Sequence, residues 1–218
     1  MRFTDLLRNP IEDIIRNISG PAGYRLRYWY YRRRMRSMGK SVTIDTGVFF
    51  VNTGYISIGE HSWIDKNCTI IAGTVSSGNI SGERTLSEEK DGIGPGEVKI
   101  GRYAHIGIGA ILQGHGGILI GDYFTTSAHC RLYSLSNDYK KSRFGTMDIH
   151  DTGYEASYYS KKIVIGKNVW LGLNVSLISA TVGDDVFVKP HSVVSGDLDA
   201  NTIAEGNPAV PVKKRFEQ

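Results

Sequence analysis

The sequence is poor in cysteine and proline, and it has no long apolar run. With 2 cysteines in 218 residues, a scaffold held together by disulfides is not expected. No apolar run approaches the length of about 18 residues that a transmembrane helix needs. The N-terminal stretch MRFTDLLRNPIEDII carries acids within its apolar part and lacks a small-residue cleavage site, which argues against a secretory signal. We therefore expect a cytoplasmic protein.

Glycine is abundant instead, at 26 residues against 6 prolines. This composition favours a β-rich chain with many tight turns over a helical bundle. The length suits one sizeable domain with its own core.

The positive charge is concentrated in one segment, RLRYWYYRRRMRSMGK. These residues, 25–40, include seven basic side chains and no acid, whereas the rest of the chain has 19 basic and 22 acidic residues. Aromatic and cationic side chains together suit a membrane interface, so contact of Arg25–Arg36 with a membrane surface is one interpretation. The alternative is a helix that packs its aromatic rings on the protein and leaves its arginines in water. No nucleic-acid-binding motif accompanies the patch, and no nucleic-acid partner is predicted.

Apolar residues recur every six positions through most of the chain. A period of six fits short strands separated by corners, and three such hexads make one turn of a triangular coil. The side chains expected to point into the prism are Ile58, Ile64, Ile70, Ile100, Ile106, Leu112, Ile120, Thr126, Leu132, Ile165, Leu171, Leu177, Val182, Val188 and Val194. The repeat therefore predicts an all-β parallel helix.

The spacing of the repeats places every insertion at one corner. Successive coil starts lie 42, 20, 45 and 17 residues apart, against 18 for three plain hexads, and each surplus enters about 15 residues after the start. That corner holds Gly73, His115, Leu135 and Ala180; we call it the loop corner. Two long loops, residues 74–97 and 136–162, leave from it. Long loops on a rigid scaffold are typical of binding sites.

The ends of the chain differ from the repeat. Isoleucines at helical spacing follow Asn9 and Pro10, which suit a helix start, and Gly20-Pro21 suits its end. A second helix is expected from about Tyr24 to Met38. We thus divide the chain into an N-terminal helical, basic-aromatic segment (1–40), the coil with its two loops (41–205) and a C-terminal tail (206–218).

The C-terminal half carries motifs of a known family. Trp170-Leu171-Gly172, then HSVV at 191–194, GNPA at 206–209 and the basic residues 213–215 follow in this order. The order resembles the ending of the hexapeptide-repeat acyltransferases, in particular the sugar and capsular-polysaccharide O-acetyltransferases. The resemblance spans about residues 42–216. It implies a left-handed parallel β-helix that forms a homotrimer and binds acetyl-CoA between subunits.

The resemblance also implies which residues hold the cofactor. Backbone groups of the C-terminal coils would follow the pantetheine arm, and the basic tail would meet phosphates. The candidates are Trp170, Gly172, His191, Asn207, Pro208, Lys213, Lys214 and Arg215.

The catalytic base departs from the family pattern. In the O-acetyltransferases of this family a histidine begins the long loop before the coil with the Trp-Ile-Gly motif, which reads Trp170-Leu171-Gly172 here. That histidine accepts the proton of the acceptor hydroxyl. Here that loop begins SLSNDYKK, with Asn137 and Asp138 in its place. Three alternatives stay open for the base: His115 at the neighbouring coil, Asp138 as base or as the partner of a histidine, and His150 folding back from the loop. The other interpretation of His115 is a corner histidine that fills space between glycines.

The resulting hypothesis is an acetyl-CoA-dependent acetyltransferase that acts on a sugar hydroxyl in the synthesis of a surface polysaccharide or glycan. A lipid-linked carbohydrate acceptor would place it at the inner face of the membrane. The alternatives are an N-acetyltransferase on an amino-sugar nucleotide and a non-catalytic β-helix scaffold. No metal site is predicted, because His61 lies in a different column from His105 and His115 and no third zinc ligand is evident.

Overall fold

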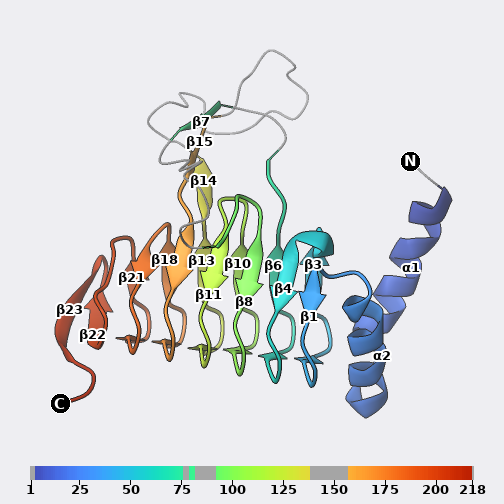
Figure 1. Cartoon of the computed structure of the whole chain (residues 1–218), viewed down its shortest axis with the longest axis horizontal. Helices are drawn as coiled ribbons and strands as arrows, with labels where there is room; N and C mark the ends of the chain where they lie inside the picture. The colour runs from blue at the N-terminus through green and yellow to red at the C-terminus, as the bar shows by residue number, and fades with distance from the viewer. Residues whose placement is uncertain (1–2, 76–78, 82–91, 138–156, 218) are drawn as a thin grey trace.

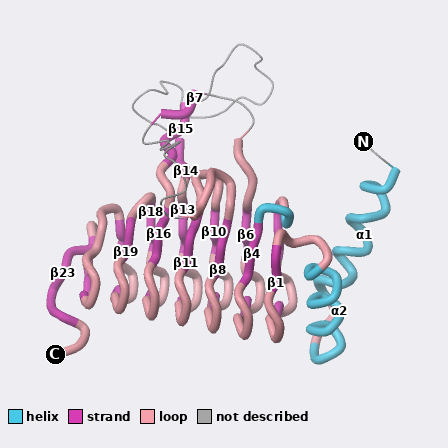
Figure 2. Tube along the Cα trace, viewed as in Figure 1, coloured by secondary structure: helices cyan, strands magenta, loops and turns pink. Residues whose placement is uncertain are grey.

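A coil of short strands runs from a helical pair at the N-terminal end to a hairpin at the C-terminal end (Figure 1). This computed structural model describes residues 3–75, 79–81, 92–137 and 157–217. The coil is the predicted left-handed parallel β-helix, and its three flat faces each consist of strands stacked in parallel register. Figure 2 shows how little of each turn is strand and how much is corner.

Each face takes one strand from every turn of the coil. Face A consists of β1 (Ser37–Met38), β4 (Ile56–Ile58), β8 (Val98–Ile100), β11 (Ile118–Ile120), β16 (Ile163–Ile165) and β19 (Thr181–Val182). Face B consists of β2 (Thr43–Ile44), β5 (Trp63–Ile64), β9 (His105–Ile106), β12 (Thr125–Thr126), β17 (Trp170–Leu171), β20 (Phe187–Val188), β22 (Thr202–Gly206) and the antiparallel β23 (Ala209–Lys214). Face C consists of β3 (Phe49–Val51), β6 (Thr69–Ile71), β10 (Ile111–Gln113), β13 (Arg131–Tyr133), β18 (Ser176–Ile178) and β21 (Val193–Val194).

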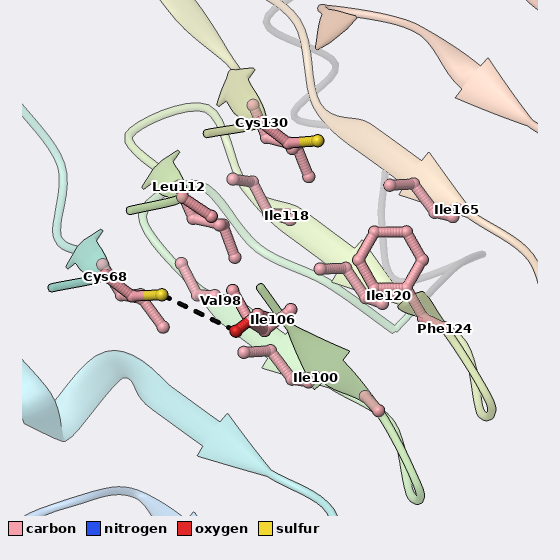
Figure 3. Packing of buried hydrophobic residues seen from close by; sticks show 14 of the residues in the cluster. Cys68, Val98, Ile100, Ile106, Leu112, Ile118, Ile120, Phe124, Cys130 and Ile165 are labelled. Atoms are coloured by element: carbon pink, nitrogen blue, oxygen red, sulfur yellow. Dashed lines mark hydrogen bonds between the residues drawn. The ribbon is translucent and has the colours of Figure 1, made fainter. Parts of the chain in front are cut away.

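The interior of the prism matches the six-residue period. All the predicted interior side chains are at most 3% exposed. The one polar member, Thr126, is accommodated because its Oγ1 accepts a hydrogen bond from Gly107 N at 2.7 Å. Figure 3 shows aliphatic side chains of successive turns meeting inside the coil, with Phe124 among them. Burial of this continuous apolar column is the main driving force for stacking the coils.

Both cysteines are buried free thiols. Each donates to a glycine carbonyl, Cys68 Sγ to Gly107 O and Cys130 Sγ to Gly172 O, both at 3.1 Å. Burial raises the pKa of Cys68 to about 12 and that of Cys130 to about 11. These thiols therefore stay protonated at neutral pH and serve packing rather than nucleophilic chemistry.

Two of the three corners are uniform. Each turn from face A to face B and from face B to face C has four residues between strands, for example residues 59–62 and 65–68. A residue with positive φ recurs at these corners, and non-glycine examples are His61, Asn67, Tyr103, Tyr123, His129, Asn168, Asn174, Asp185 and His191. Asparagine, aspartate and histidine tolerate this left-handed conformation better than most residues do.

The corner from face C to face A is the loop corner. It spans residues 52–55, 72–97, 114–117, 134–162 and 179–180 in successive turns. Described parts of its two long insertions pair with each other: β14 (Leu135–Asn137), β15 (Ser157–Ser160) and β7 (Asn79–Ser81) form a small sheet that rises from this corner (Figure 1). Both loops thus leave from the predicted edge and meet above it.

The N-terminal segment differs from the expected helices. α1 (Phe3–Asn17) begins before Asn9 and contains Pro10, and α2 (Gly20–Arg32) begins where the first helix was expected to end. Pro21 occupies the first turn of α2, where its missing N–H costs nothing. α2 also ends earlier than Met38, because residues 37–38 form β1 and pair with β4.

α2 is fastened to the coil by Arg27, whose side chain is fully buried. Its Nε donates to Ile44 O of the edge strand β2, and its Nη1 donates to Ile15 O, Arg16 O and Ile18 O near the end of α1. Burial lowers the pKa of this guanidinium, partly offset by the nearby Asp45 carboxylate. One side chain therefore joins both helices to the first turn of the coil. Neither helix in the described ranges is long and apolar enough to cross a membrane.

Candidate active site

His115 lies at the loop corner between the stems of the two long loops. Its backbone O accepts a hydrogen bond from Gly96 N at 3.0 Å, at the end of the first loop. The next residue, Gly116, donates to Ser134 Oγ at 2.9 Å, at the start of the second loop. The half-buried imidazole is thus held where both insertions join the coil.

A backbone carbonyl selects the tautomer of His115. Nδ1 lies 2.6 Å from Gly73 O. Because a carbonyl oxygen can only accept, Nδ1 must carry the proton in this hydrogen bond. In the neutral ring the lone pair then resides on Nε2, for which the described residues offer no hydrogen-bond partner. This is the arrangement that a general base requires.

Ser134 is a supporting residue that sequence reasoning missed. It is fully buried, and its hydroxyl donates to Gln113 O at 2.8 Å while accepting from Gly116 N. The hydroxyl therefore ties the strand before His115 to the residue after it. The available signal was its position two residues before the predicted loop 136–162.

Of the other catalytic candidates, the structure describes only Asn137. Asn137 is exposed on β14, paired with Tyr158 of β15, on the sheet that rises from the loop corner. Asp138 and His150 lie outside the described residues. His115 is therefore the predicted base for which a position and a partner are known.

Two cofactor candidates lie in one row across face B. The register aligns Trp170 with Phe187, Phe187 with Ile203, and Ile203 with Lys213. At about 4.8 Å per strand, the row spans roughly 14 Å. Trp170 is exposed, its ring packs against Phe187 with centroids 4.9 Å apart, and its Nε1 donates to Ser127 Oγ at 3.2 Å. The row ends in an exposed cation, as expected for an extended ligand with phosphates at one end.

Four further cofactor candidates gather at the B–C corner and in the hairpin turn beside it. A Cβ on Gly172 would lie 2.7 Å from Pro190 N, so only glycine fits there, next to the turn that contains His191. His191 is exposed at a positive-φ position. Asn207 and Pro208, joined by a cis peptide bond, form the turn between β22 and β23. Gly206 N at the start of that turn donates to Ser192 Oγ at 3.1 Å, which fixes the turn beside His191.

The basic tail divides into exposed and anchored cations. Lys213 and Lys214 are exposed on β23. Arg215 instead directs Nη1 to the carbonyl oxygens of Asn168 and Val186, and its guanidinium lies over the Phe216 ring. Arg215 thus holds the tail on the coil, which differs from the phosphate contact expected for all three.

Within one chain the two groups of candidates lie at different corners. His115 is between faces C and A, whereas Gly172 and His191 are between faces B and C. Face C separates them. The described residues also contain no group of three or more side chains suited to hold a metal ion.

Comparisons with known proteins point to one class of enzyme. No family profile matches the chain. The dTDP-4-amino-4,6-dideoxy-D-glucose acyltransferase of Escherichia coli is 27% identical over 184 residues, which cover 84% of each protein. The putative colanic acid biosynthesis acetyltransferase WcaF of Escherichia coli strain K12 is 31% identical over 124 residues, or 56% of this chain and 62% of WcaF.

A solved structure with the same fold extends this likeness. A variant of AntD, an N-acyltransferase from Bacillus cereus in complex with dTDP and coenzyme A, matches with a TM-score of 0.68 and 25% identity. The match covers 86% of this chain and 89% of AntD.

Proposed function

Because the chain belongs to the hexapeptide-repeat acyltransferases, we propose that it transfers the acetyl group of acetyl-CoA to a hydroxyl of a sugar, with His115 as the general base. The observation that carries the proposal is the hydrogen bond from His115 Nδ1 to Gly73 O. It leaves Nε2 as the proton acceptor at the corner where both long loops begin. A hydroxyl is a weak nucleophile at neutral pH, so a positioned imidazole is the group this reaction needs.

The chemistry at this corner is a simple acyl transfer. Nε2 of His115 takes the proton of the acceptor hydroxyl as its oxygen bonds to the thioester carbonyl carbon. The carbon–sulfur bond then breaks, and the proton returns to the departing thiolate. The products are the acetyl ester and coenzyme A, and the imidazole is restored to its starting tautomer.

The position of the donor follows from the row on face B and the turn at 206–209. Trp170 and the B–C corner would contact the pantetheine arm, and Lys213 and Lys214 would meet phosphates. Because His115 lies across face C from this corner in the same chain, we propose that His115 of one subunit meets the donor held by the next. A homotrimer with one site at each subunit boundary satisfies this requirement.

A second acceptor chemistry has specific support. The Escherichia coli relative, whose match covers 84% of this chain, is named for acyl transfer to an amino sugar. AntD is named as an N-acyltransferase. An amine needs less help from a base than a hydroxyl does. N-acetylation of an amino-sugar nucleotide is therefore the second candidate, and the carbohydrate acceptor is common to both.

We place the reaction in the synthesis of a surface polysaccharide or glycan, at the cytoplasmic side of the membrane. The relative WcaF, named for colanic acid biosynthesis, supports this pathway class. A lipid-linked carbohydrate is the acceptor that would bring the enzyme to the membrane surface.

Donor binding is tested by titration calorimetry with acetyl-CoA. The test variant is Lys213→Ala/Lys214→Ala. The charge-matched control is Lys40→Ala/Lys99→Ala, whose lysines lie at the first and third turns of the coil. Arg215 is left intact because it anchors the tail. We expect micromolar binding that weakens in the test variant and not in the control. The absence of binding at millimolar acetyl-CoA would contradict the proposal and favour a scaffold.

Acceptor chemistry is tested with matched pairs of sugars. Acetylation of a hydroxy sugar that is lost in His115→Gln supports O-transfer. Acetylation of the amino analogue alone, largely retained in His115→Gln, selects N-transfer instead.

A further inference from the structure

The helical pair exposes apolar side chains that the coil does not cover. On α1, Ile11 and Ile14 are 53% and 64% exposed, and on α2, Leu26 and Trp29 are 45% and 56% exposed. Each pair is spaced three residues apart and so lies on one side of its helix. These side chains are large for positions in contact with water.

Two apolar side chains of α1, Ile11 and Ile14, are turned away from the body. Glu12, one residue from Ile11, accepts hydrogen bonds from the hydroxyls of Tyr30 and Tyr31, and Arg16 lies over the Phe49 ring. Glu12, Ile15 and Arg16 therefore face α2 and the first turn of the coil, whereas Ile11 and Ile14 face outward beside the exposed Asp13.

The exposed side of α2 combines apolar groups with unpaired cations. Arg25, Arg32 and Arg33 are exposed beside Leu26 and Trp29. Among the described residues, no carboxylate pairs with these three arginines. Arg32 and Arg33 instead lie over the Tyr28 and Trp29 rings, with guanidinium carbons 5.6 and 5.2 Å from the centroids.

A groove opens next to this surface. Between α2 and β2, a hollow of about 340 Å³ is lined by residues that include Tyr24, Arg25 and Trp29. Aromatic walls and an arginine at one place suit a phosphate-bearing headgroup that has an apolar neighbour.

We propose that Ile11, Ile14, Leu26 and Trp29, with Arg25, Arg32 and Arg33, form a docking surface for an anionic lipid bilayer. The apolar side chains enter the interface, and the arginines meet lipid phosphates. Lipid is favoured over a protein partner because the exposed Asp13 beside Ile14 is paired with Arg16, which leaves unpaired charge of one sign. In addition, arginine and tryptophan lie on the same helical face. This inference extends the lipid-linked acceptor of the proposed function by specifying the surface that meets the lipid.

The position of the surface at the end of the coil adds a geometric argument. The helical pair lies beyond the first turn, at the N-terminal end of the prism (Figures 1 and 2). In a trimer whose axis is parallel to the prism, the three helical pairs lie at the same end of the assembly. One bilayer could then contact all three surfaces at once, which multiplies a weak individual contact.

Vesicle flotation tests the inference with the full chain. Vesicles of equal parts phosphatidylcholine and phosphatidylglycerol are compared with vesicles of phosphatidylcholine alone. The wild type should float with the anionic vesicles and dissociate at high salt. Arg32→Gln/Arg33→Gln should weaken binding roughly 30-fold, and Leu26→Ser/Trp29→Ser about tenfold or more. The matched controls Arg131→Gln and Ile108→Ser, exposed on the coil, should bind as the wild type does.

Each contrary outcome is identifiable. Failure of the wild type to float, or equal losses in the control variants, would overturn the inference. A change of oligomeric state in Leu26→Ser/Trp29→Ser, measured by sedimentation velocity, would assign the surface to subunit contact and also overturn it. Acetyl-CoA titration of every variant without vesicles separates the two proposals, because loss of donor binding with intact flotation contradicts the enzyme and not the docking surface.

Discussion

The loop corner and the two uniform corners of the coil have opposite properties. Turns from face A to B and from B to C keep four residues throughout, with a positive-φ residue in almost every turn. The loop corner varies from two residues at 179–180 to the insertion of residues 134–162. It also holds His115 and the paired strands of both loops. The uniform corners keep the register of stacking, and the variable corner carries the proposed catalytic base.

Replacing one histidine at each kind of corner by alanine is the strongest test of this contrast. His115→Ala should lower kcat by about 10²- to 10⁴-fold, the usual contribution of a general base. His129→Ala, at a positive-φ position of the B–C corner, should leave kcat within about twofold of the wild-type value if it supplies structure only. Steady-state kinetics of the two variants, with thermal melts to confirm folding, check this. Equal losses of kcat in both variants would show that the two kinds of corner do not differ in this way.

Adding one residue at each kind of corner tests their different tolerance. A glycine inserted after Asn168, at an A–B corner, would turn Leu171 out of the core and should cost about 3 kcal/mol or more. The same insertion after Thr74, at the loop corner, should cost less than about 0.6 kcal/mol. Urea denaturation of the two variants measures the difference. A similar cost at both places would mean that the uniform corners are not set by stacking.

Backbone conformation at a uniform corner can be tested at Asn174, where φ is 57°. Asn174→Val should destabilise the fold by about 1–2 kcal/mol, because a branched side chain is strained in the left-handed region. Asn174→Gly should be close to neutral. A valine variant as stable as the glycine variant would show that the left-handed conformation does not restrict the side chain at position 174.

The smallest expected effect is electrostatic. At the A–B corner, the Arg102 guanidinium bonded to Asp122 at 2.7 and 3.1 Å holds the pKa of that carboxyl below its usual value. A depressed pKa in the folded state means stability that is present above the unfolded pKa, about 4, and is lost as pH falls through the folded value. Asp122→Asn should therefore flatten the acid side of a melting-temperature profile, and Arg102→Gln should do the same. An unchanged slope would show that the exposed pair contributes nothing measurable.

Much of the fold was predictable because its determinants are local and repeated. Interior positions such as Ile70 and Leu177 recur at a fixed spacing, so the register of the whole stack follows from the period. The surplus between repeats also located the loop corner correctly. The N-terminal helices were placed less well. Pro10 lies inside α1 and not at its start, and Pro21 lies in the first turn of α2 and not at the end of the first helix.

The location of the candidate site could be predicted from the sequence, and its contacts could not. Spacing alone singled out His115, but its partner Gly73 O lies 42 residues away and carries no side-chain signal. The role of Arg215 also depends on distant backbone carbonyls that no local motif marks. Contacts of this kind arise from the stacking of turns and are invisible in a single repeat.

The two ends of the coil also bear on self-association. Stacked parallel turns resemble a short length of cross-β fibre, whose open edges could template another molecule. Here the carbonyl edge of β2 is taken by Arg27 under the helical pair, and face B finishes in β23, which reverses direction against β22. Because β23 is antiparallel to the other strands of the face, a turn of another molecule cannot continue the parallel stacking on it. The protein thus uses the geometry of a filament while blocking its growth at both ends of that face.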